Sequence, residues 1–216
     1  MSASPALIYP AGDHRLEVAN AEQLAQIRHP DMNLVVWRRT PPEHWQGLLE
    51  RLMRYRVHVY VCLATAEVES RLLAEFSQQC EIEADSIELV RDIDRLAQHF
   101  ARIANIDQLL LRLEVIRSDE CRLFHVDRKP VRLLCTYSGP GFEWLANETV
   151  DRAALGHGNN DRISGGRQPF HLETGDVALL KGETWPGNAG NGLVHRSPPL
   201  DPGNQRLRLR LDIPEN

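Results

Sequence analysis

The run RLRLRLDI at residues 206–213 alternates arginine with aliphatic residues along nearly its whole length. Successive side chains of a β-strand point to opposite faces of the sheet. Leu207, Leu209 and Leu211 would therefore share one face, and the arginines would share the other. This run predicts a strand with one apolar face and one arginine-bearing face near the end of the chain.

Other short β-type runs precede it, at 109–116, 131–137 and 176–181, and joints rich in glycine and proline separate them. Many short strands without helices between them indicate a sandwich or a barrel. The sequence therefore predicts an all-β unit over residues 108–216.

Residues 1–107 have a different pattern, in which predicted helices surround two predicted strands at 33–37 and 57–63. Thr40 and Glu43 resemble a capping box at a helix start, and further helices are predicted over 68–79 and from Asp85 onward. We expect an α+β protein in which this mixed α/β region packs on the β unit.

Composition excludes several classes of function. The chain has 216 residues and a formal net charge of −5, with no run of basic residues, so no nucleic-acid surface is expected. Its four cysteines lack zinc-ribbon spacing, and neither an export signal nor a membrane-spanning segment is visible. We expect a soluble, cytoplasmic protein. No P-loop, dinucleotide fingerprint or hydrolase triad is found.

His125 and Asp127 stand two positions apart in a strand-like segment and would share a face. They could be the wet face of an edge strand in a β-sandwich that binds no metal. They could also be two ligands of a non-haem iron site, which needs two imidazoles and one carboxylate. His195 follows a strand and a long glycine-rich turn, and it is the candidate for the third ligand.

The arginine run begins 11 positions after His195, at Arg206. A guanidinium group can bind a carboxylate through two parallel hydrogen bonds. Arg206, or failing it Arg208, could therefore hold the far carboxylate of a 2-oxo acid. Spacing alone does not choose between them, because both lie on one face. Tyr137, Trp144 and Trp185 could line the same pocket, although core packing explains them as well.

The order H-x-D, distant histidine, arginine resembles that of the double-stranded β-helix (jelly-roll, cupin-like) Fe(II)/2-oxoglutarate dioxygenases over roughly residues 109–213. The resemblance implies a barrel for residues 108–216. It also implies that His125, Asp127 and His195 bind Fe(II), that Arg206 or Arg208 binds 2-oxoglutarate, and that the protein hydroxylates a substrate that the sequence does not identify.

Nearly the whole chain also resembles a bacterial domain family of unknown function, through FHVDRKPVRLLCTYSGPGFEW, GDVALLKGETWPGNAGNGLVHRSPP and RLRLRLD. Members of that family are often encoded beside zinc-starvation genes and metallochaperones. This resemblance implies an alternative, a cupin-like zinc-binding protein of zinc homeostasis without catalytic turnover. The sequence leaves open the metal, a small-molecule or protein substrate, and the oligomeric state.

Overall fold

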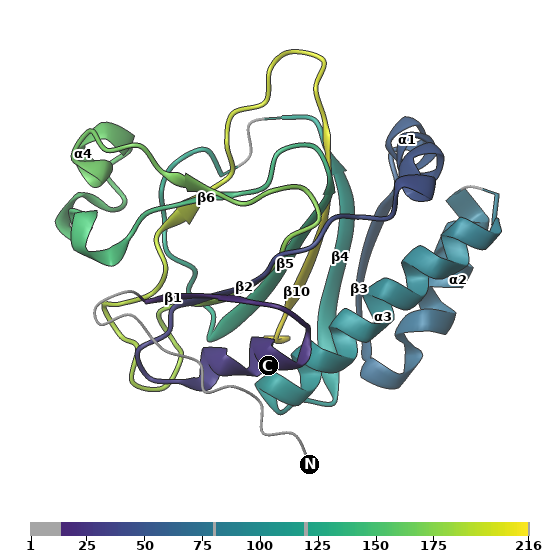
Figure 1. Ribbon diagram of the computed structural model, residues 1–216, viewed down its shortest axis with the longest axis horizontal. Helices are drawn as coiled ribbons and strands as arrows, with labels where there is room; N and C mark the ends of the chain where they lie inside the picture. The colour runs from purple at the N-terminus through teal and green to yellow at the C-terminus, as the bar shows by residue number, and fades with distance from the viewer. Residues whose placement is uncertain (1–13, 80, 119–120, 216) are drawn as a thin grey trace.

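The computed structural model describes residues 14–79, 81–118 and 121–215 (Figure 1). Seven strands form one large sheet in the order β1-β2-β8-β5-β10-β4-β3. All neighbours in it are antiparallel except β1 and β2. The strands of this sheet are β1 (Arg15–Val18), β2 (Leu34–Trp37), β3 (His58–Ala64), β4 (Gln108–Ile116), β5 (Val131–Ser138), β8 (Val177–Lys181) and β10 (Arg206–Asp212).

One face of this sheet packs on helices α1 (Gln46–Tyr55), α2 (Val68–Gln79) and α3 (Ala84–Ala104), which lie on one side of β3 and β4 in Figure 1. Leu207, Leu209 and Leu211 are fully buried in the core between the sheet and these helices. The leucine face predicted for the last strand is therefore confirmed. The arginines between them lie on the other face, as alternation requires.

A second, three-stranded sheet covers part of that other face. It has the order β7-β6-β9 and consists of β6 (Glu143–Trp144), β7 (Phe170–His171) and β9 (His195–Arg196). Its Trp144 packs with Leu134 of β5 and Leu180 of β8 in a separate apolar cluster. Between β6 and β7 lies the short helix α4 (Asn160–Ser164). The space between the two sheets, beyond this cluster, holds the polar site described below.

The N-terminal region contributes strands to the same large sheet. β1 and β2 extend it beside β8, and β3 forms its opposite edge beside β4. Residues before and after position 107 thus share one sheet and one core. No helix among the described residues is long and apolar enough to cross a bilayer.

Two local predictions were wrong. Thr40 and Glu43 do not form a capping box, because a 3₁₀ turn over Glu43–Trp45 follows Pro42 without a side-chain cap, and α1 begins only at Gln46. The capping box is instead at the start of α3, where Glu83 and Ser86 exchange side-chain and backbone hydrogen bonds. The segment that contains His125 is not a regular strand either, since only His125 pairs, in an isolated antiparallel bridge to His195.

A buried ion pair ties α3 to the sheet on the helix side. Asp92 of α3 accepts two hydrogen bonds from the Arg39 guanidinium, at 2.7 and 2.8 Å, and one from the Tyr137 hydroxyl at 2.7 Å. Burial alone would raise the pKa of Asp92, but the hydrogen bonds and positive charge of Arg39 outweigh it and lower the pKa.

We predict that Asp92→Asn destabilises the protein by about 3 kcal/mol, because it leaves the buried charge of Arg39 uncompensated. The lowered pKa of Asp92 means that its contribution is present above the pKa of the unfolded chain and lost as pH falls through the folded pKa. Urea unfolding between pH 3 and pH 7 measures both effects. In Asp92→Asn this part of the pH dependence should vanish. Asp94→Asn, two positions further along α3 and only half-buried, is the control.

Candidate metal centre

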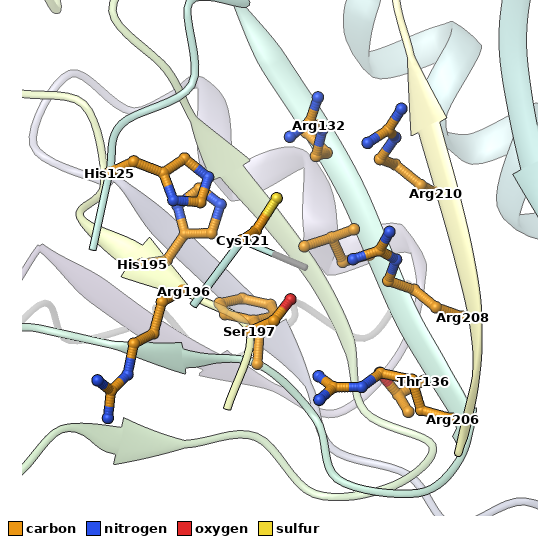
Figure 2. A pocket seen from close by; sticks show the side chains of 12 residues that line it. Cys121, His125, Arg132, Thr136, His195, Arg196, Ser197, Arg206, Arg208 and Arg210 are labelled. Atoms are coloured by element: carbon orange, nitrogen blue, oxygen red, sulfur yellow. The ribbon is translucent and has the colours of Figure 1, made fainter. Parts of the chain in front are cut away.

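Backbone pairing brings the two histidines together. His125 and His195 exchange two backbone N–H···O=C hydrogen bonds of 3.0 Å each, although 70 positions separate them in the chain. Residues paired in this way carry their side chains on the same side of the ladder. The ring centroids are accordingly 4.6 Å apart, and Figure 2 shows both rings at one side of a pocket.

Each imidazole is oriented by a hydrogen bond to a carbonyl oxygen of its own segment. Nδ1 of His125 lies 2.8 Å from the carbonyl oxygen of Leu123, and Nδ1 of His195 lies 3.1 Å from that of Leu193. A carbonyl only accepts, so Nδ1 carries the proton in both rings and Nε2 keeps its lone pair. This is the tautomer in which a histidine binds a metal through Nε2.

Asp127 completes the cluster. Its Oδ2 lies 3.6 Å from His195 Nε2, and its Oδ1 lies 3.9 Å from His125 Nε2. One ligand atom from each of the three residues fits within 4.8 Å of the others, a spacing at which they could hold a metal ion. Asp127 Oδ2 is buried and accepts no hydrogen bond from the described residues. A buried carboxylate oxygen facing two imidazole lone pairs is costly unless a cation lies between them.

The other oxygen of Asp127 is held by Arg132, whose guanidinium donates to Oδ1 at 2.6 Å. Two further nitrogens of Arg132 donate to Asp212 of β10, at 2.7 and 3.2 Å. All three side chains are largely buried. Arg132 therefore fixes the orientation of Asp127 and leaves only Oδ2 for a metal.

Electrostatics prepare the cluster for a cation at neutral pH. Burial lowers the pKa of His195 to about 4, so its imidazole is neutral. Burial would raise the pKa of Asp127, but nearby positive charge, including that of Arg132, lowers it below the usual range. Because His195 is uncharged at neutral pH, Arg132 is the partner that keeps Asp127 ionised there. One carboxylate and two imidazoles suit a divalent metal.

The pocket beside this cluster has about 460 Å³ of empty space, its open mouth included. One wall is the polar face of β10, and Figure 2 shows Arg206, Arg208 and Arg210 along that strand, across the pocket from the two histidines. The remaining lining residues are Cys121, His125, Arg132, Leu134, Thr136, Phe142, His195, Arg196 and Ser197.

The two arginines that spacing left equivalent have different surroundings. Arg208 donates to the Glu114 carboxylate at 2.8 Å, so its charge is met within the protein. Arg206 is only 2% exposed and donates to the carbonyl oxygen of Pro198 at 2.5 Å. In Figure 2 it lies beside Thr136, at the end of the β10 wall away from Arg132.

The aromatic residues that sequence suggested for the pocket lie elsewhere. Tyr137 is on the helix side of the sheet, where its hydroxyl donates to Asp92. Trp144 stacks on Phe170, with ring centroids 4.5 Å apart. Trp185 packs at the margin of the main core. None of them is among the lining residues that the structure describes.

Sequence reasoning missed Arg132 and Asp212. Phe142 lines the pocket, and its ring meets that of His195 edge-on at a centroid distance of 5.7 Å. A signal for Arg132 was present, because it is the one charged residue in the apolar run VRLLCTY and a buried strand rarely carries a charge without a partner. The identity of that partner depended on strand order, which no sequence pattern gave.

The fold and site define a mixed helix-and-strand protein with a large antiparallel sheet and a His/Asp/His cluster able to hold a metal. Residues 19–212 match the family described as Protein of unknown function (DUF1826), and the chain belongs to that family. No curated protein matches the sequence.

Among solved structures, the chain is similar to dioxygenase for auxin oxidation 1 from Arabidopsis thaliana, solved as a 2-oxoglutarate complex. The TM-score is 0.52 at 9% identity, with 94% of this chain and 92% of that chain covered. A bsmA homologue from Methylobium petroleophilum has a TM-score of 0.48 at 14% identity, covering 91% and 93%. A prolyl-4-hydroxylase from Pseudomonas putida has 0.46 at 10%, covering 90% and 99%. Only the first likeness bears on the fold, which is similar to that of a 2-oxoglutarate oxygenase.

We predict that His195→Ala abolishes stoichiometric uptake of a divalent metal without unfolding the protein, because it removes one of three ligand atoms and leaves the backbone bridge intact. Co(II) titration followed by absorption, with circular dichroism as the folding check, measures this. His171→Ala is the matched control, since His171 is an exposed histidine of the same small sheet. Full metal occupancy in His195→Ala would remove this residue from the site.

We predict that Arg132→Gln lowers the stability of the metal-free protein by about 3 kcal/mol, because two buried carboxylates lose their shared cation. Added divalent metal should then raise the melting temperature more in this variant than in the wild type, since the metal becomes the main counter-ion of Asp127. Arg128→Gln, an exposed neighbour, should match the wild type. Equal metal-induced shifts in Arg132→Gln and wild type would contradict the coupling of Arg132 to the site.

Proposed function

We propose that the protein is a non-haem Fe(II)- and 2-oxoglutarate-dependent oxygenase of unknown substrate. The observation that carries this proposal is the cluster of two Nε2 lone pairs and the bare Oδ2 of Asp127 beside one pocket, with a buried arginine across the cavity. A protein that only stores a metal needs the three ligand atoms but does not need the arginine.

We propose further that the strands after residue 107 form a double-stranded β-helix. The large sheet contains β4-β10-β5-β8 and the small sheet contains β7-β6-β9 with His125 bridged to β9. Successive segments from β4 to β10 thus move between the two sheets. In this interpretation residues 108–216 form the metal-binding unit, and residues 1–107 supply the helices and edge strands that pack on it.

The residues of this chain perform binding, orientation and exclusion of water. His125, Asp127 and His195 would hold the metal beside the pocket. Fe(II) with 2-oxoglutarate supplies the oxidising chemistry when bound. The largely closed, arginine-walled pocket keeps bulk water from the reacting centre.

Arg206 is proposed to bind the far carboxylate of 2-oxoglutarate. Its burial lowers the local dielectric and strengthens a two-pronged guanidinium–carboxylate interaction. The Thr136 hydroxyl, beside it in Figure 2, can donate a further hydrogen bond. The likeness in fold to an auxin dioxygenase solved with 2-oxoglutarate supports this choice of cosubstrate.

Anaerobic titration with Fe(II) and 2-oxoglutarate tests the proposal. A weak visible charge-transfer band should appear only when both are present. Arg206→Gln should raise the 2-oxoglutarate concentration for half-saturation roughly tenfold or more, because a charged hydrogen-bonded pair is lost. The control is Arg117→Gln, which removes an exposed arginine that does not line the pocket.

The alternative function, zinc binding without turnover, predicts a different result. The same three ligands and one water satisfy tetrahedral zinc. No band at any 2-oxoglutarate concentration, together with tight stoichiometric zinc that His195→Ala abolishes, would replace the oxygenase by a zinc-binding protein.

A further inference from the structure

Two arginines stand directly opposite each other on the pocket side of the large sheet. In the register of β10 with β4, Arg210 pairs with Arg112. The neighbouring pairs carry opposite charges. Arg208 of β10 is opposite Glu114 of β4, and Asp212 of β10 is opposite Arg132 of β5. Directly opposite side chains are about 5 Å apart at Cβ, and like charges in that position are destabilising.

Among the described residues, the surroundings relieve this repulsion only in part. Arg210 Nε lies 3.1 Å from Asp212 Oδ2, but Asp212 already accepts two hydrogen bonds from Arg132. Arg112 lies 3.9 Å from a Glu114 oxygen that Arg208 occupies at 2.8 Å. The buried Nε–H groups of Arg112 and Arg210 make no hydrogen bond.

The charge balance of the region is positive even when the proposed site is filled. The guanidinium groups of Arg112, Arg132, Arg208 and Arg210 outnumber the carboxylates of Asp127, Asp212 and Glu114, counted among described residues. The other charged groups at its border are paired, Arg196 with Glu143 and Lys129 with Glu215. A divalent metal and a dianionic cosubstrate cancel each other, so they leave this excess unchanged.

The pair also lies near the metal pocket, because Arg210 lines it. Arg132 and Arg210 line both the metal pocket and a second hollow, which opens over the edge of the sheet at Tyr60 and Cys62. The Arg112 guanidinium covers the ring of Tyr60 at 4.4 Å, and Tyr60 lines this second hollow, so Arg112 lies beside it. Side chains of Arg112 and Arg210 are 26% and 19% exposed, so they are recessed but reachable.

We infer that the Arg112–Arg210 pair binds an anionic group of a small-molecule substrate, a carboxylate or a phosphate, beside the metal centre. An oxyanion between two opposed guanidinium groups accepts hydrogen bonds from both and removes their repulsion. The recessed position and the size of the hollow, about 710 Å³ with its open mouth, fit a small acid. That the anion belongs to a substrate rests on the proposed oxygenase function. The existence of the anion site does not depend on that function.

The test uses the metal-free full chain, so that it is independent of oxygenase activity. Inorganic phosphate and tricarballylate are titrated by calorimetry, and melting temperatures are measured with and without each. We expect at least one probe to bind the wild type and raise its melting temperature, and Arg112→Gln to bind that probe roughly tenfold more weakly. Preference for phosphate or for the tricarboxylate tells which oxyanion the site takes.

Matched variants separate this site from the cosubstrate arginine. Arg91→Gln makes the same charge change at an exposed position of α3, on the far side of the sheet. This variant should bind the probe as the wild type does. Arg206→Gln should retain most of the binding. Should Arg112→Gln fail to fold, Arg112→Lys keeps the charge but loses the two-pronged donor and should still weaken binding. The inference is overturned if neither probe binds, if the Arg112 variants bind like the wild type, or if Arg206→Gln alone abolishes binding.

Discussion

The site depends on one short piece of backbone pairing, the bridge between His125 and His195. The two hydrogen bonds of this bridge fix the relative position of segments that are remote in the chain. Each imidazole is then locked by a carbonyl of its own segment, so the position of both Nε2 atoms follows from the backbone. Little of this geometry relies on flexible side chains, which is what a preorganised metal site requires.

Buried ion pairs are the second feature on which the site depends. The polar face of the large sheet is a lattice of guanidinium and carboxylate groups in which Arg132 connects Asp127 to Asp212. Burying such pairs costs desolvation that their attraction only partly returns. Their presence between two sheets, where aliphatic residues could pack instead, supports the proposed binding of charged groups in the pocket. The opposed Arg112 and Arg210 continue the same face toward the second hollow.

The two faces of the large sheet have different roles, since one packs on the helices and the other faces the pocket. On the helix side, leucines of β10 and the Asp92–Arg39 pair hold α1, α2 and α3 to the sheet. On the other side, apolar residues of the small sheet pack on β2, β5 and β8, whereas β10 and part of β5 face the cavity. Family membership adds no activity, since the family itself is described only as of unknown function. The proposed function therefore rests on the metal cluster and its pocket.

The sequence by itself determined the local patterns. Alternation in RLRLRLDI assigned each residue of β10 to its face, and helical periodicity located α2 within its observed bounds, because both depend on near neighbours. H-x-D and His195 were recognisable as ligand types. Only the tertiary structure decided that their ligand atoms meet, that Arg132 holds Asp127, and that Arg112 opposes Arg210. Those contacts follow from strand order and register across the sheet, which arise from packing of the whole chain and leave no fixed spacing in the sequence.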